Sequence, residues 1–388
     1  MTYDTSRRGF LTAGLALPLA GLHNKIGLFQ SEYSPAGTNA PVKLDYRTLG
    51  KTHLQVTTLG FGCMITSDPS VITRAADIGI NYFDTARSYQ HGNNERMVGA
   101  ALKGKRKQIV LSTKSSAPDK EAALKDLDTS LQELGTDYVD IWYLHAKSNP
   151  TDIHDDLIEA QQIAKKQGKI RFAGVSTHSG QRELLPWLAQ KGAFDVVLVA
   201  YNFTMDRGME QSVEAVAKGN LGVVGMKVMA GGFKSLKPGD PTIEKLHREG
   251  AMLSALRWAL KNPNVSTTIP SMTDMDQLEE NLKAMAQPFG AADEKLLATK
   301  LEVIKPLYCR LCGECEGTCA KGLSIQDTLR FLTYAEGYGQ FALGRERFQE
   351  LPVVQKAVRC GDCNECTVKC RHGVQVSARM SRAQELFA

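Results

Sequence analysis

The feature that most constrains the fold is a regular alternation of short, β-rich apolar runs with helical patterns between about residues 45 and 286. The runs are LGFGC (59–63), YFDTA (82–86), IVLST (109–113), VDIWYLH (139–145), IRFAGVS (170–176), VVLVAYN (196–202), GVVGMKV (222–228) and STTIPS (266–271). Helical spacing of apolar residues occurs between them, as from Ala122 to Leu134 and from Met252 to Leu260. Eight strand–helix repeats predict an α/β chain with a (β/α)8 TIM barrel. The alternative is a doubly wound open sheet, but no strand is followed by a G-x-G-x-x-G segment that opens a helix.

Polar side chains stand at the ends of several predicted strands, at Asp84, Lys114, His145 and Ser176. In a barrel of this kind the carboxyl ends of the strands meet at one rim, which carries the active site. Each residue alone has a structural explanation, because Asp often caps a helix, Lys is usually solvated and a single His is usually structural. Their occurrence together predicts a reactive site at this rim.

The chemistry expected of this group is proton transfer by a tyrosine. A free Tyr has a pKa of about 10. A nearby Lys ammonium favours the phenolate and lowers that pKa, while an Asp holds the Lys in place. Such a Tyr could donate a proton to a carbonyl oxygen as hydride reaches the carbonyl carbon, and His145 could orient the carbonyl by a hydrogen bond.

These segments resemble the aldo-keto reductases over roughly residues 45–286. The motifs that carry the resemblance are NYFDTARSYQHGNNERMVGAAL (81–102), VLSTK (110–114), LGTDYVDIWYLH (134–145), GKIRFAGVST (168–177) and IPSMTDMDQLEENL (269–282). The resemblance implies a (β/α)8 barrel, a bound nicotinamide dinucleotide and interconversion of a small alcohol and its carbonyl. The family's catalytic tetrad falls on Asp84, Tyr89, Lys114 and His145, with Tyr89 as the acid/base.

The resemblance is less complete around the cofactor. It implies that Ser176 holds the nicotinamide carboxamide and that Glu280 and Asn281 hold the adenine. Other family positions differ here: Thr177 replaces Asn, Leu198 replaces Gln, Met226 replaces the stacking Tyr, and Ser271 and Gln277 replace the Lys and Arg that bind the 2′-phosphate of NADP.

Loss of two cations opposite a phosphate removes charge-assisted hydrogen bonds of about 1.5–3 kcal/mol each. A strong preference for NADP is therefore not expected. Three alternatives for the cofactor remain: NAD, another electron carrier, or a nicotinamide held by rearranged contacts. Lys227 either contacts the pyrophosphate or ribose, or is a lysine with a buried stem at a strand end.

Eight of the nine cysteines lie in two runs with the pattern C-x2-C-x2-C-x3-C. They are Cys309, Cys312, Cys315 and Cys319, then Cys360, Cys363, Cys366 and Cys370. This spacing is typical of two [4Fe-4S] clusters, in which the fourth cysteine of each run reaches the other cluster. The predicted sets are therefore Cys309, Cys312, Cys315 with Cys370, and Cys360, Cys363, Cys366 with Cys319.

Zinc sites and disulfides account for the cysteine pattern less well. A zinc site does not require the third cysteine of each run, and two identical runs argue against disulfides. The Pro that usually follows the fourth cysteine is replaced by Ala320 and Arg371. Ile325, Leu329 and Leu332 recur at helical spacing between the runs, so we predict a mainly helical two-[4Fe-4S] ferredoxin-type domain over residues 292–388, after a barrel over 45–290. Cys63 is predicted to be a buried core thiol.

The start of the chain contains Ser6-Arg7-Arg8-Gly9-Phe10-Leu11, followed by an apolar run to about Leu22. This order is typical of a twin-arginine signal, and an ordinary basic N-terminus before a helix is the alternative. We expect a signal segment over 1–30, a linker over 31–44 and export by the twin-arginine machinery, with a periplasmic location. No A-x-A cleavage site follows.

The leading hypothesis is an exported aldo-keto reductase-like oxidoreductase whose clusters exchange electrons with a redox partner. The alternative is an electron-transfer protein whose barrel is a docking scaffold, and a third hypothesis makes the clusters purely structural. The net charge of +5 is spread through the chain without a basic, aromatic-rich stripe, so no nucleic-acid partner is expected.

Overall fold

The computed structural model describes residues 43–233, 240–363 and 365–388. The predicted signal segment and almost all of the predicted linker lie outside the described residues. None of the helices among the described residues is long and apolar enough to cross a membrane.

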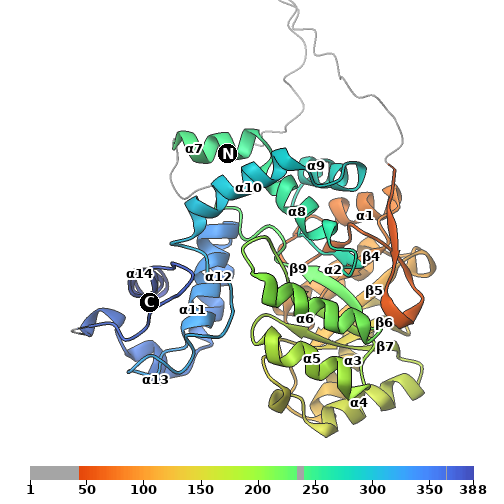
Figure 1. Ribbon diagram of the computed structural model, residues 1–388. Coiled ribbons are helices and arrows are strands. Elements are labelled where there is room, and N and C mark those ends of the chain that lie inside the picture. The colour runs from red at the N-terminus through yellow and green to blue at the C-terminus, as the bar shows by residue number, and fades with distance from the viewer. Residues whose placement is uncertain (1–42, 234–239, 364) are drawn as a thin grey trace, which may run out of the picture. The chain divides into compact units, whose positions relative to one another are not determined.

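A barrel of eight parallel strands forms the first part of the described chain (Figure 1). Its strands are β3 (Phe61–Gly62), β4 (Tyr82–Asp84), β5 (Val110–Ser115), β6 (Val139–Leu144), β7 (Ile170–Thr177), β8 (Val196–Ala200), β9 (Gly222–Met226) and β10 (Thr267–Thr268). Each strand pairs in parallel with the next one along the chain, and a parallel bridge between Leu59 and Thr268 joins the first strand region to the last. The predicted (β/α)8 barrel and its eight strand positions are confirmed.

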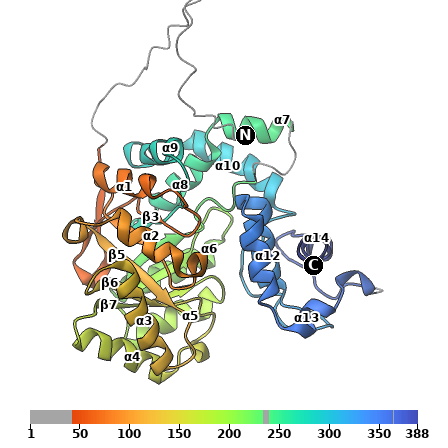
Figure 2. The same ribbon diagram turned by 180° about the vertical axis from the view of Figure 1, so that it is seen from behind.

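Helices surround the strands, as Figures 1 and 2 show. They are α1 (Pro69–Ile78), α2 (Asn93–Ala101), α3 (Lys120–Leu134), α4 (Asp155–Lys166), α5 (Gln181–Lys191), α6 (Arg207–Lys218), α8 (Ala251–Lys261) and α9 (Met275–Ala286). Two further helices, α7 (Pro241–Arg248) and α10 (Ala291–Ile304), pack against α8. Asp residues cap several of them: the carboxylates of Asp68, Asp119, Asp206, Asp240 and Asp274 accept backbone N–H bonds at the starts of α1, α3, α6, α7 and α9. Such caps satisfy donors that have no partner inside the helix.

Side chains alternate between two cores along each strand, because neighbouring residues of a strand point to opposite faces. In β6, Ile141 and Tyr143 belong to the apolar cluster inside the barrel, whereas Trp142 and Leu144 pack in the layer between strands and helices. A hairpin of β1 (Tyr46–Thr48) and β2 (Gln55–Thr57) precedes the barrel. Cys63 is fully buried in the outer core, as predicted.

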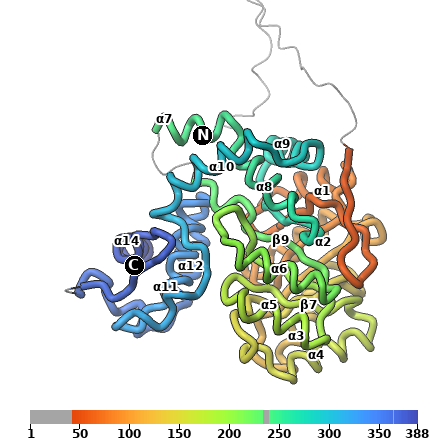
Figure 3. The backbone as a smooth tube through the Cα atoms, viewed as in Figure 1, coloured from red at the N-terminus to blue at the C-terminus, as the bar shows by residue number. Residues whose placement is uncertain are grey.

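The helix α10 packs against α8, and these two helices lie side by side with α9 (Figure 3). Asp293 of α10 accepts a hydrogen bond of 2.6 Å from the Ser254 hydroxyl and forms an ion pair of 3.2 Å with Arg257. The boundary predicted near residue 292 thus falls at the start of a helix that packs on the barrel.

The remainder of the chain is mainly helical, as predicted. It contains α11 (Ile325–Leu332), a π-helical turn η5 (Thr333–Gly337), α12 (Phe341–Gln349), α13 (Val353–Ala357) and α14 (Val376–Phe387). An apolar core that includes Phe331, Phe348 and Phe387 joins α11, α12 and α14. Hydrogen bonds connect this segment to barrel loops, for example from the backbone N–H of Gly232 to the Gly337 carbonyl at 2.8 Å.

Candidate active site and cysteine centres

The four residues predicted as a catalytic tetrad meet at one rim of the barrel. Asp84 ends β4, Lys114 lies in β5, and Tyr89 and His145 follow β4 and β6. The Lys114 ammonium pairs with the Asp84 carboxylate and donates to the Tyr89 hydroxyl at 3.2 Å. The rings of Tyr89 and His145 meet edge to face at 5.9 Å between centroids. This geometry brings the Tyr89 phenol, the Lys114 ammonium and the His145 imidazole together at the rim of the barrel.

The protonation of Tyr89 differs from the simple expectation. Burial raises the pKa of the Tyr89 phenol above its usual value; the Lys114 charge opposes this rise but does not cancel it. For Lys114, burial lowers the pKa, but the charges of Asp84 and Tyr89 outweigh burial and the pKa is raised. The site without ligand therefore holds a protonated phenol beside a charged lysine, which suits donation of a proton to a carbonyl oxygen.

A second histidine, His178, joins the site although its sequence position gave no signal for it. Its ring lies 6.4 Å from the His145 ring, measured between centroids. Burial, and after it the charges of surrounding cations, holds the pKa of both imidazoles well below the usual value. Neither Nδ1 atom has a hydrogen-bond partner among the described residues. Both rings are thus neutral and have a free polar atom at neutral pH.

A cleft with a cavity volume of about 420 Å³ begins at the tetrad and leads along the rim. Asp84, Tyr89 and His178 line one part of it. It is also lined by five residues that the resemblance implied for the cofactor: Lys227, Ser271, Gln277, Glu280 and Asn281. Two tetrad residues, Asp84 and Tyr89, therefore share one cavity with these five positions.

Ser176 lies at the rim but does not line this cleft among the described residues. Its side chain is buried, and its hydroxyl accepts a hydrogen bond of 2.9 Å from the Ala146 N–H. Its backbone carbonyl accepts a second bond of 2.9 Å from the Lys147 N–H. In this structure Ser176 holds the loop that carries His145.

The segment after the barrel supplies part of the cleft wall, which the sequence did not predict. Gly337, Tyr338 and Gln340 line the cleft, and the Tyr338 ring stacks on that of Tyr334 at 5.7 Å between centroids. The Lys227 ammonium lies 4.7 Å from the centroid of the Tyr334 ring. Lys227 was expected either to contact the pyrophosphate or ribose or to be a lysine with a buried stem at a strand end, and the structure places its head group over aromatic rings at the cleft.

The eight run cysteines form two groups, and each group draws one member from the other run. Cys319 lines a small cavity together with Cys360, Cys363 and Cys366. In the other group, Cys309 lies within electrostatic range of Cys315, Cys312 and Cys370. None of the nine cysteines forms a disulfide. These are the two four-cysteine sets predicted from the spacing.

The surroundings of the two groups are apolar. Six of the run cysteines pack against a buried cluster that includes Leu323, Ile325, Val374 and Met380. Low polarity and thiolate ligands are typical of iron–sulfur centres. Each group offers four sulfur ligands in an apolar setting, a set that can hold a [4Fe-4S] cluster.

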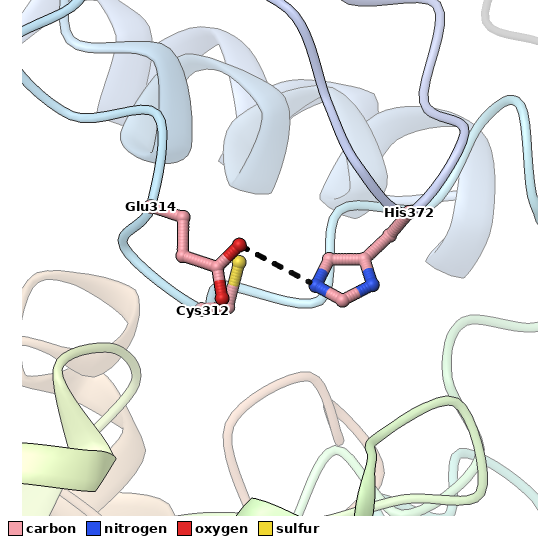
Figure 4. Close-up of side chains that lie close together, drawn as sticks. All are labelled: Cys312, Glu314 and His372. Atoms are coloured by element: carbon pink, nitrogen blue, oxygen red, sulfur yellow. Dashed lines mark ion pairs between the residues drawn. The ribbon is translucent and has the colours of Figure 1, made fainter.

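Cys312 also lies close to Glu314 and His372, as Figure 4 shows. One ligand atom of each lies within 4.8 Å of the others, so the three could hold a metal ion. Glu314, however, already forms ion pairs of 3.2 Å with Arg371 and 3.6 Å with Arg182. The carboxylate is therefore better explained as part of a surface ion-pair network beside the first cysteine group.

Comparisons with known proteins agree with the barrel. The model of the aldo/keto reductase family matches residues 67–302 and ends before Cys309. The chain is 27% identical to an uncharacterized oxidoreductase, YqkF, of Bacillus subtilis, over 68% of this chain and 97% of the relative. It is 25% identical to L-galactose dehydrogenase of Arabidopsis thaliana, over 68% of this chain and 96% of the relative. The holo structure of aldo-keto reductase AKR11C1 from Bacillus halodurans matches with a TM-score of 0.57 and 28% identity, over 66% of this chain and 96% of that one.

Proposed function

This chain belongs to the aldo/keto reductase family, and from that premise we propose that it is an exported oxidoreductase with two [4Fe-4S] clusters. It interconverts a small alcohol or sugar and its carbonyl, and the clusters relay electrons to or from a redox partner. The observation that carries the proposal is the coexistence, in one chain, of the assembled rim of Asp84, Tyr89, Lys114 and His145 with two four-cysteine groups.

The cleft fits a nicotinamide dinucleotide. Its volume of about 420 Å³ is within the range of roughly 300–1,000 Å³ that is usual for cofactor sites. Glu280 and Asn281, which line the cleft, would hold its adenine end. When bound, the nicotinamide supplies the hydride donor or acceptor.

The chain's own residues transfer the proton and orient the substrate. For reduction, Tyr89 donates its phenolic proton to the carbonyl oxygen, and Lys114 with Asp84 stabilises the phenolate left behind. The neutral rings of His145 and His178 orient the same oxygen by hydrogen bonding. For oxidation, the Tyr89 phenolate accepts the hydroxyl proton.

The nucleotide is proposed to be NAD rather than NADP. The Gln277 amide is engaged with its own loop, donating to the Thr273 hydroxyl at 2.8 Å and to the Asp274 carboxylate. Asp274 itself caps α9, which fixes a negative charge beside Gln277. A 2′-phosphate placed here would meet a carboxylate and no cation from Ser271 or Gln277, so its binding is disfavoured.

Mass spectrometry of the small molecules that are released from the purified protein tests this assignment. We expect NAD to predominate over NADP. The double variant Ser271→Lys/Gln277→Arg should shift the ratio of the NADP and NAD dissociation constants at least tenfold toward NADP, because each new cation contributes about 1.5–3 kcal/mol. A change of Lys218→Met on exposed α6 serves as the control. NADP as the dominant nucleotide of the unmodified protein contradicts the assignment.

We propose the clusters because the electrons released by alcohol oxidation need an acceptor. Oxidation of one alcohol to its carbonyl releases two electrons and two protons. Outside the cytoplasm no fresh nicotinamide is expected, so a bound nucleotide would need an electron acceptor within the protein. The two four-cysteine groups would hold the clusters, which would supply two one-electron centres and a route to a one-electron carrier protein.

The export proposal rests on the paired arginines at Arg7 and Arg8. The twin-arginine route carries proteins that fold before they cross the membrane, often around a cofactor. A chain that must receive two metal clusters and a nucleotide in the cytoplasm has a reason to use it. A periplasmic location follows from the same proposal.

A second candidate function is an electron-transfer protein whose barrel is a docking scaffold. Leu198 and Met226, which replace the usual nicotinamide contacts, favour it, because both pack in the apolar cluster inside the barrel. The intact geometry of Tyr89, Lys114 and Asp84 favours the enzyme. The substitution of Tyr89 that is considered in the Discussion separates the two.

A further inference from the structure

A cation lines the cleft on the side of His178, and the tetrad does not explain it. Lys227, from the loop after β9, and Arg330, from α11, both act on the phenol of Tyr334 in the π-helical turn η5. The Lys227 ammonium lies 3.5 Å from the Tyr334 hydroxyl. Tyr334 is only 5% exposed. The phenol and the two cations therefore meet in a sheltered place next to the cleft.

The positive charge of this cluster is only partly neutralised. Lys227 has no carboxylate within ion-pair distance anywhere in the part of the chain that the structure describes. Arg330 pairs with Asp327 at 2.5 Å, but its Nε atom has no partner among the described residues. Asp84, the other nearby acid, is neutralised by Lys114. The cluster therefore has a small excess of positive charge.

The same charges reach the reactive rim. The pKa of His178 is lowered by burial and then by Lys227 and Arg330, and that of His145 by burial and then by Lys114, Arg330 and Arg347. Burial would raise the pKa of Tyr334, yet Lys227 and Arg330 outweigh it and lower the pKa. Lys227 lines the same cleft as Tyr89.

The backbone of Lys227 adds an independent observation. Its φ is 56°, a left-handed conformation that side chains other than glycine seldom adopt and that is concentrated at functional sites. The Asn202 amide donates to the Lys227 carbonyl at 3.2 Å and to the Tyr308 hydroxyl at 3.0 Å. The chain thus holds Lys227 in an unfavourable conformation in which its ammonium reaches Tyr334 at the cleft.

We propose that Lys227, Arg330 and Tyr334 form a subsite for a carboxylate of the substrate, so that the enzyme acts on an acidic alcohol or carbonyl compound such as a sugar acid. This inference rests on the proposed function and names its substrate class. The small excess of charge suits a singly charged carboxylate better than a doubly charged phosphate. Lys227 lines the cleft and supplies the charge, and the Tyr334 hydroxyl lies 3.5 Å from its ammonium, where it would add a directed hydrogen bond to the anion.

The test is equilibrium binding to the cluster-loaded protein, measured by calorimetry with two matched pairs of probes. D-glucuronate is compared with D-glucose, and glycolate with ethylene glycol; inorganic phosphate is a further arm. We expect each carboxylate to bind at least tenfold more tightly than its neutral partner. Lys227→Met and Tyr334→Phe should each reduce that preference to less than threefold, while the remote control Lys218→Met leaves it unchanged.

Three outcomes overturn the proposal. They are equal binding of acidic and neutral partners, a carboxylate preference that survives both variants, and tighter binding of phosphate through the same residues, which would indicate a phosphorylated substrate. Tyr334→Phe keeps the ring and its stacking on Tyr338, so a failure to fold does not obscure the result. The binding measurement does not depend on turnover, so the two proposals can fail separately. A protein that reduces neutral sugars and shows no preference for carboxylates overturns only the proposed subsite. An inactive protein that still prefers carboxylates overturns only the proposed enzymatic activity.

Discussion

Replacement of Tyr89 by Phe should reduce the rate of alcohol–carbonyl interconversion by at least about 100-fold and by up to about 10⁴-fold, the range that a positioned acid/base contributes. The phenol is the only hydroxyl that Lys114 contacts at the rim among the described residues, and Phe keeps the ring that packs against His145. The loss should therefore come from proton transfer and leave the barrel intact. Steady-state turnover with added nucleotide, measured by nicotinamide absorbance, gives the rate.

The matched control is Tyr46→Phe, which removes a hydroxyl from a 46% exposed ring on β1 and should leave turnover unchanged. The Tyr89 variant should also keep its iron and accept electrons from a chemical reductant as the unmodified protein does. Turnover within a few-fold of normal in the Tyr89 variant would remove the phenol from the mechanism and favour the barrel as a docking scaffold.

Replacement of Cys319 by Ala should remove one of two clusters, and the lost cluster should be the one that the second run holds. Two cubane clusters contain about eight iron atoms per chain, so the iron content should fall to about four. The reason is spatial: Cys319 belongs to the first run in sequence but lines the cavity of Cys360, Cys363 and Cys366. Iron analysis, together with electron paramagnetic resonance of the reduced protein, measures the loss.

Two companion variants make this result specific. Cys370→Ala should remove the other cluster, because Cys370 lies with Cys309, Cys312 and Cys315. Cys63→Ala, in the buried core of the barrel, should leave all iron in place. If the Cys319 variant instead loses the cluster of Cys309, Cys312 and Cys315, the predicted exchange of the fourth ligand between the two runs is wrong. If the unmodified protein contains no iron after anaerobic purification, the prediction of two clusters is wrong.

Much of the barrel was predictable because its signals are local. The strands are short runs of β-branched and aromatic residues, each flanked by a helix with its own apolar face. Asp84, Lys114 and His145 could be placed at one rim because they stand at or directly after strand ends, and parallel strands end at the same face. The two groups of cysteines were predictable because each run has the ligand spacing that is typical of [4Fe-4S] proteins.

The rest of the site depends on contacts between distant parts of the chain. The wall formed by Tyr334 and Tyr338 meets Lys227 across a separation of more than 100 residues, and no local pattern announces it. The pKa of Tyr89 rises because burial outweighs the Lys114 charge, a balance that residue types alone do not decide. For the same reason the sequence did not predict that Ser176 turns its hydroxyl to the loop at Ala146.

The proposed function requires electrons to pass from the substrate to the clusters, and this transfer can be followed by absorbance. The protein is purified anaerobically with its nucleotide and oxidised clusters, and alcohols, sugars and sugar acids are added singly without an external electron carrier. The visible absorbance of the clusters should bleach with a compound that the enzyme also oxidises, and the Tyr89→Phe variant should bleach only with a chemical reductant. Clusters that stay oxidised with every compound that the enzyme turns over would contradict the proposed transfer.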